Sequence, residues 1–138
     1  MEINAYLTFP GTCGEAIEFY KKSLGATLKT INYYKGSPME SQVPMDWAQK
    51  IMHASIMIGS SELKLADGEP GIPPNGVPGF SLTINVASEA EGANVFTALS
   101  EGAKVTMPYE QQFWGAHFGM LTDKFAVSWM VHCDLSKE

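Results

Sequence analysis

The sequence predicts an α+β fold in which a βαβββ module occurs twice. A helix with the same start and end signals appears once in each half of the chain, preceded by one strand-like stretch and followed by three more. Apolar and polar residues alternate along these stretches, which is typical of sheets with one face under a helix and the other face free. We therefore expect two similar folding units.

The first strand of each module is predicted at residues 3–9 and 80–86, where alternation is regular. The helix after it opens with a Ser/Thr-x-x-Glu sequence, Thr12 with Glu15 in the first module and Ser88 with Glu91 in the second. This spacing predicts a capping box, which satisfies two backbone amides at a helix start. Each helix is expected to end at a glycine. These glycines are Gly25 and Gly102.

Three further strands are predicted in each module. In the first they are residues 27–34, 51–58 and 62–66, and in the second residues 104–107, 116–122 and 127–133. The stretch between the modules, DGEPGIPPNGVPG, is rich in proline and glycine and continues neither a helix nor a strand. The chain is thus predicted to be one domain of two repeats, at residues 1–67 and 80–138, with a linker at 68–79.

The alternation also predicts the register of the last hairpin in each module. Pairing Ile58 with Leu63 and Ile56 with Leu65 keeps the large apolar side chains on one face. In the second module, pairing Thr122 with Val127 groups apolar residues in the same way and sets His117 opposite His132. The opposite faces are then expected to carry polar side chains, with His53, Ser55, Met57 and Lys64 in the first module, and His117, Leu121, Ser128, Met130 and His132 in the second.

The amino-acid composition argues against two classes of partner, nucleic acids and membranes. The net charge is −6 and the few lysines form no cluster, which argues against a nucleic-acid partner. No apolar run is long enough to span a membrane, and the start has no signal-peptide pattern, so we expect a cytoplasmic protein without a membrane partner. Cys13 and Cys133 lie far apart in the sequence, which favours buried thiols over a disulfide.

Several stretches together resemble one known family. EAIEFYKKSLGA, IMHASIMIGSSELKLADG and MPYEQQFWGAHFGMLTDKFAVSWMV are similar to the PhnB-like branch of the glyoxalase, bleomycin-resistance and extradiol-dioxygenase (vicinal oxygen chelate) superfamily. The resemblance covers essentially the whole chain. It implies curled half-barrel sheets that form cups, with helices outside, and a homodimer. Members of this superfamily are metal-dependent enzymes or, as in bleomycin resistance, binding proteins without metal or catalysis.

The metal positions implied by this resemblance carry poor ligands in this chain. They fall on or beside Asn4 and Ser81 in the first strands and near Lys64 and Met130 in the fourth strands. Divalent metal sites need imidazole nitrogen or carboxylate oxygen, so we expect no metal and no cofactor. Glu62 would supply one carboxylate if the alignment were shifted by two residues.

The three histidines, His53, His117 and His132, are all expected on the cup faces. Histidine transfers protons near neutral pH, but a hydrogen-bonded residue in a cleft gives the same pattern. Phe113 and Trp114 precede a predicted strand and suit the rim or floor of an apolar pocket, or equally a core or dimer contact.

The long loop before residue 51 contains Trp47, which is expected to form either a lid over a cup or an interface. The sequence therefore predicts a small-molecule-binding protein of unknown specific activity. The alternative is a lyase, transferase or dioxygenase of the same superfamily that uses a metal or a histidine base. The expected ligand-binding residues are His53, His117, Trp114, Phe113, Trp47, Met130 and His132.

Overall fold

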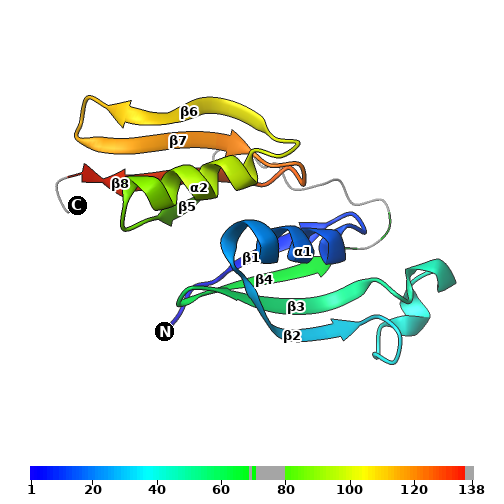
Figure 1. The fold of residues 1–138 in the computed structure, drawn as a ribbon. Helices are drawn as coiled ribbons and strands as arrows, with labels where there is room; N and C mark the ends of the chain where they lie inside the picture. The colour runs from blue at the N-terminus through cyan, green and yellow to red at the C-terminus, as the bar shows by residue number, and fades with distance from the viewer. Residues whose placement is uncertain (69, 71–79, 136–138) are drawn as a thin grey trace. The chain divides into compact units, whose positions relative to one another are not determined.

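The computed structural model describes residues 1–68, 70 and 80–135, and confirms that the βαβββ order occurs twice (Figure 1). The chain divides into two compact units, unit 1 (Met1–Asn75) and unit 2 (Gly76–Glu138). The predicted linker at 68–79 lies outside the described residues except for Gly68 and Pro70. Among the residues described, no helix is long and apolar enough to cross a membrane.

Unit 1 is a four-stranded sheet with one helix on one face. Its strands lie in the order β1-β4-β3-β2, with β1 and β4 parallel and the other pairs antiparallel. The elements are β1 (Ala5–Phe9), α1 (Cys13–Leu24), β2 (Thr27–Tyr33), β3 (Ile51–Ile58) and β4 (Ser61–Asp67). Apolar side chains of β3 and β4 and of α1 are fully buried between the layers. This buried layer is the main stabilising element of the unit.

The start of α1 differs from the sequence prediction. Thr12 precedes the helix but makes no side-chain capping hydrogen bond. The buried carboxylate of Asp67 takes that place, accepting hydrogen bonds from the backbone amides of Cys13 at 2.8 Å and Ile51 at 2.9 Å. An anionic acceptor at a helix N-terminus is favoured by the helix dipole. The helix ends as predicted at Gly25, which adopts the left-handed conformation with φ 67°.

Unit 2 repeats the arrangement, with strand order β5-β8-β7-β6 and only the β5–β8 pair parallel. The elements are β5 (Leu82–Asn85), α2 (Glu89–Leu99), β6 (Lys104–Gln112), β7 (Ala116–Thr122) and β8 (Ser128–Asp134). Here the capping box is confirmed. Ser88 Oγ accepts from the Glu91 amide at 3.1 Å, and Glu91 Oε1 accepts from the Ala87 amide at 2.9 Å.

The predicted register of the first terminal hairpin is wrong by two residues. Ile56 pairs with Leu63, and Ile58 pairs with Ser61, the residue that opens β4. A shift of two residues keeps every side chain on its predicted face. Ala54, Ile56, Leu63 and Leu65 are accordingly buried on the α1 side, as expected.

The predicted register of the second terminal hairpin is wrong by one residue, so the faces of the strand β7 are reversed relative to the prediction, whereas Trp129 and Val131 of β8 lie on the predicted side. Thr122 pairs with Ser128, not with Val127, and His117 lies opposite Cys133, not opposite His132. The turn explains the shift, because the amide of Asp123 donates to the carbonyl of Val127 at 2.8 Å and extends the pairing into the loop. Leu121, Trp129, Val131 and Cys133 are buried on the α2 side as a result.

Candidate functional site

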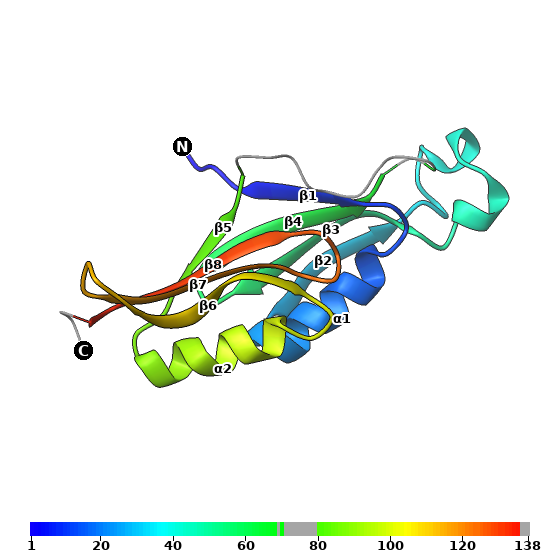
Figure 2. The ribbon, with the colours of Figure 1, turned by 90° about the horizontal axis from the view of Figure 1, so that it is seen from above.

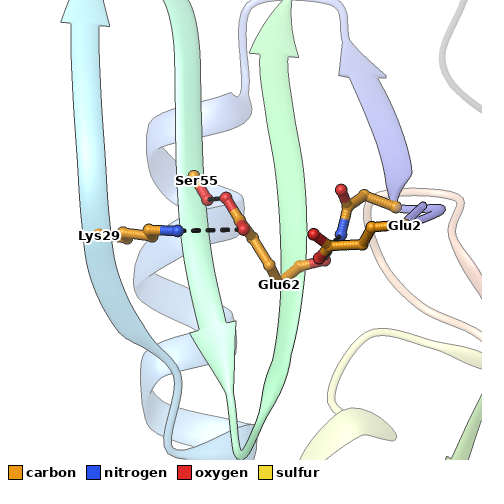
Figure 3. A network of polar contacts seen from close by, with 5 residues as sticks. Glu2, Lys29, Ser55 and Glu62 are labelled. Carbon is orange, nitrogen blue, oxygen red and sulfur yellow. Dashed lines mark hydrogen bonds and ion pairs between the residues drawn. The ribbon is translucent and has the colours of Figure 1, made fainter.

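The face of the unit 1 sheet opposite α1, here called the α1-distal face, carries a network of polar side chains (Figure 3). Glu62 lies at its centre. Its Oε1 accepts from Lys29 Nζ on β2 at 3.1 Å, and its Oε2 accepts from the buried Ser55 hydroxyl on β3 at 2.5 Å. Its backbone carbonyl accepts from Asn4 Nδ2 at 3.4 Å, and the same amide group donates to Glu2 at 3.1 Å. The network thus joins β2, β3 and β4 to the residues before β1.

These contacts favour the ionised form of Glu62. The hydrogen bond from Ser55 is the largest cause that lowers the pKa of Glu62 below its usual value, and the hydrogen bond from Lys29 is the next. Hydrogen bonds to a carboxylate and a nearby cation both stabilise the charged form. The network therefore depends on pH.

We expect the protein to lose, in acid, the stability that ionised Glu62 contributes. Its folded-state pKa lies below its unfolded-state pKa, so its contribution is complete above the unfolded value of about 4.3 and is lost as the pH falls through the folded value. Urea denaturation of the wild type and of Glu62→Gln, measured from neutral pH to acid, checks this. The difference in free energy of unfolding between the wild type and Glu62→Gln should disappear in acid. A difference that stays the same at every pH would contradict the role assigned to the Glu62 carboxylate.

The residues present do not fit a divalent metal ion. Both carboxylate oxygens of Glu62 are engaged, one by Lys29 and one by Ser55, and Lys64 brings a second ammonium group to the same face. Within the described ranges, no group of three or more His, Cys, Asp or Glu side chains is placed to hold a metal ion.

His53 lies on the α1-distal face, as predicted. Its ring meets that of Tyr6 on β1, with 5.9 Å between the ring centroids. Tyr6 pairs with Lys64 on β4, and β4 separates β1 from β3, so the two rings reach toward each other across the middle strand. The structure thus brings a phenol and an imidazole together on the face that also carries Lys64.

The face of the unit 2 sheet opposite α2, here called the α2-distal face, is aromatic. Trp114 contacts Phe113 edge-on at 5.1 Å between centroids and Phe118 at 5.9 Å. Phe118 in turn meets His132, its partner across β7 and β8, at 6.3 Å. Half of Trp114 and nearly all of Phe113 are exposed. Four rings in series therefore run from the β6–β7 turn onto the sheet.

A row of methionines lies beside these rings. Met107, Met120 and Met130 occupy directly paired positions on β6, β7 and β8. Met130 Sδ accepts from Thr83 Oγ1 on β5 at 3.8 Å. Methionine is flexible and makes favourable contacts with aromatic rings, so this row forms an adaptable apolar floor.

His117 lies on the other face of unit 2, beneath α2, which corrects the predicted cup position. Its Nε2 is 3.3 Å from Glu89 Oε1 on α2, and its ring centroid is 5.1 Å from that of Tyr109. Its Nδ1 is buried without a hydrogen-bond partner in the described part of the chain. The predicted pairing of His117 with His132 does not occur, because the register of β8 differs by one residue.

The loop between β2 and β3, which contains Trp47, projects beyond the ends of these strands (Figure 2). The loop contains the short 3₁₀ helices Glu40–Gln42 and Met45–Trp47. The indole Nε1 donates to the carbonyl of Gly68 at 3.0 Å, and Lys50 Nζ donates to the carbonyl of Gly11 at 2.9 Å beside the same ring. Trp47 thus links the loop to the chain segments after β1 and β4.

A groove of about 310 Å³ also lies between α1 and β2. It is lined on the strand side by Leu28, Ile31 and Tyr33 and on the helix side by Glu15 and Glu18. It lies on the α1 side of the sheet, away from Glu62 and His53.

Sequence reasoning did not find Lys29, Phe118, Met107 or Met120 as site residues, although it chose Met130 from the same row. Lys29 reaches Glu62 only because β2 is interrupted by a register shift between Leu28 and Thr30. Phe118 was placed on the helix side by the register error. Met107 lies opposite Met120 between two irregularities in the β6–β7 pairing, and Pro108, which falls within the second, is the local signal that could have indicated a bulge there.

Comparison with known proteins adds the following. A family model described as 3-demethylubiquinone-9 3-methyltransferase matches residues 1–132. The protein YjdN of Escherichia coli K12 is 30% identical over 140 residues, covering 96% of this chain and 95% of that protein. The crystal structure of protein PA1353 from Pseudomonas aeruginosa is 44% identical, covers 97% of this chain and 98% of that chain, and has a TM-score of 0.84.

Two less similar structures show the same fold. A putative 3-demethylubiquinone-9 3-methyltransferase, PhnB protein, from Bacillus cereus is 24% identical over 96% of this chain and 99% of that chain, with a TM-score of 0.82. A glyoxalase/bleomycin resistance protein from Albidiferax ferrireducens T118 is 10% identical over 94% of this chain and 95% of that chain, with a TM-score of 0.66.

Proposed function

We propose that this chain, which belongs to the family described as 3-demethylubiquinone-9 3-methyltransferase, binds a small planar apolar molecule on the α2-distal face of unit 2. The resemblance to the PhnB-like branch of the glyoxalase and bleomycin-resistance superfamily is confirmed, and so is the fold class. Membership of a superfamily does not specify an activity. The proposal therefore depends on the residues of this face.

The four-ring series of Phe113, Trp114, Phe118 and His132 carries the proposal. Exposed rings with few rotatable bonds bury a large area at little entropic cost when a flat ligand covers them. Met130, from the row beside them, supplies a surface that adapts to the ligand's outline. His53 is proposed to contact a ligand on the α1-distal face. His117 and Trp47 are not part of the proposed binding site. His117 contacts Glu89 of α2, and the Trp47 indole donates to the Gly68 carbonyl.

Calorimetric titration of the full chain with naphthol tests the proposal. We expect saturable binding in the wild type and at least about a tenfold loss of affinity in Trp114→Ala, because aromatic anchors dominate binding surfaces of this kind. Trp114→Phe should keep most of the affinity, since it keeps a ring at the same place.

The matched control is Tyr33→Ala, which removes a similarly exposed ring from β2 of unit 1. It should bind naphthol as the wild type does. Equal losses in the Tyr33 and Trp114 variants, or no saturable binding by the wild type, would rule out the aromatic series as the site. Mass spectrometry of the recovered ligand then separates a binding protein from an enzyme.

We also propose a homodimer in the cytoplasm, as the sequence predicts. Exposed apolar side chains outside the aromatic series, among them Met45 and Phe80, support the dimer, since a contact between copies would remove their surface from water. Light scattering of the purified chain gives the mass of the assembly, and cell fractionation gives the location. A monomer at micromolar concentration would exclude the dimer.

A further inference from the structure

We propose that the α1-distal face of unit 1 binds an oxyanion, a carboxylate or phosphate group, through Lys64, His53 and Tyr6. This site lies on a different unit from the aromatic series and does not depend on the function proposed for it. Three observations carry the inference: the position of Lys64 in the sheet, the engagement of Glu62, and the ring pair that spans β4.

Lys64 lies in the middle of this face. It pairs with Tyr6 on one side and with Ser55 on the other, and its side chain is half-buried. Within the part of the chain that the structure describes, its ammonium group makes no hydrogen bond or ion pair. An ammonium group that makes no hydrogen bond keeps its three donors available for an anionic ligand.

Glu62 is the nearest acid on the same strand, but it is already engaged. Lys29 and Ser55 occupy its two carboxylate oxygens, at 3.1 Å and 2.5 Å (Figure 3). Lys64 also helps to lower the pKa of Glu62 through its charge, but its effect is smaller than those of Ser55 and Lys29, and it makes no ion pair with Glu62. The network therefore holds three strands together and keeps both carboxylate oxygens of Glu62 on Lys29 and Ser55.

The rings of Tyr6 and His53 complete the site. They belong to strands roughly 10 Å apart, yet their centroids are separated by 5.9 Å, so both lean over β4 beside Lys64. The phenol and the imidazole are hydrogen-bond donors on the same face as Lys64, and an ammonium group forms strong charge-assisted bonds to an oxyanion that neutral donors then supplement. No metal ion is needed for this recognition.

The test is a titration of the full chain with inorganic phosphate and with acetate at constant ionic strength, followed by backbone amide NMR. We expect saturable shifts confined to the amides around His53 and Lys64. Lys64→Met should weaken binding by about tenfold or more, because it removes the charged donor. His53→Phe keeps a ring against Tyr6 but removes the donor, and should weaken binding by a smaller factor.

Lys22→Met is the matched control, because it removes the same charge from an exposed position in the last turn of α1. It should bind as the wild type does. Binding of phosphate alone would identify a phosphate group, and binding of both anions would identify a general oxyanion site. The inference is overturned if neither anion saturates, if Lys64→Met binds as tightly as the wild type, or if Lys22→Met loses as much affinity.

Two further variants connect the network to the site. Lys29→Met frees Glu62 to pair with Lys64 and should weaken anion binding, whereas adding Glu62→Gln to it should restore binding. Trp114→Ala should leave anion binding unchanged, so failure of the aromatic site is distinguishable from failure of this one. Loss of anion binding in Trp114→Ala would contradict an independent site on unit 1.

Discussion

Replacing Gly119 with alanine is expected to lower the free energy of unfolding by about 3 kcal/mol. Gly119 lies on the α2 side of β7, and an added Cβ would be 2.7 Å from the Phe96 ring and 2.8 Å from the backbone Cα of Tyr109. A side chain can rotate away, but the backbone of β6 cannot move without disturbing its pairing with β7. Urea denaturation followed by circular dichroism measures the loss.

Gly14→Ala is the matched control for this prediction. It adds the same methyl group in the first turn of α1, where the new Cβ would meet only Ile51 Cδ1 at 3.8 Å. Alanine favours helix, so this variant should be stabilised by up to about 1 kcal/mol. Gly92→Ala should fall between the two, because its Cβ would meet the hydroxyl of Tyr109, which is the movable end of a side chain. A Gly119 variant as stable as the wild type would contradict this prediction and would show that both the Phe96 ring and the β6 backbone at Tyr109 shift to make room.

The elements of the fold could be predicted from sequence because their signals are local. The second capping box, formed by Ser88 and Glu91, and the closing glycine Gly25 lie within a few residues of the helices they delimit. The cap of α1 could not be predicted, because Asp67 comes from the end of β4 and reaches Cys13 only after the sheet has formed. A local motif at Thr12 competes with this distant carboxylate and does not form.

The sequence predicted correctly which side chains of the unit 1 hairpin face α1, but it exchanged the two faces of β7 in unit 2. The size of each register error explains the difference. A hairpin error of two residues, as at Ile56, leaves each side chain on its face, whereas an error of one residue, as at Thr122, exchanges the faces. That single residue decides whether Phe118 or His117 faces away from α2. The candidate site in unit 2 was therefore only partly predictable, although Trp114 and His132 were both chosen from sequence.

The polar network of unit 1 shows a second limit. Glu62, Ser55 and Lys29 belong to three strands, and their contact needs the registers of two strand pairs and the irregularity in β2. Sequence spacing gives none of these. The identity of Lys64 did indicate a poor metal ligand, and this same residue lies at the centre of the proposed oxyanion site.

Asp123→Ala is expected to lower the free energy of unfolding by about 3 kcal/mol or more. The Asp123 carboxylate is almost fully buried and accepts from the amides of Phe125 at 2.8 Å and Val127 at 3.0 Å. It also accepts from the indole Nε1 of the buried Trp129 at 2.8 Å. Alanine would leave these donors without an acceptor in the interior, and a buried unsatisfied donor costs more than the bond itself contributes.

The turn that Asp123 holds also contains Ala126, which has a left-handed backbone with φ 69°. A non-glycine residue adopts this conformation at a cost, so the carboxylate maintains a turn that the local sequence does not favour. Hydrogen exchange should therefore show the amides of β7 and β8 opening first in Asp123→Ala, with tryptophan emission shifted to longer wavelength.

Asp46→Ala is the matched control, because it removes an exposed carboxylate, and it should change stability little. Equal effects in the two variants would show that charge, not the turn, is responsible. Because this turn sets the register of β8, its loss should also disorder His132 and Phe118, and with them the aromatic face on which binding is proposed.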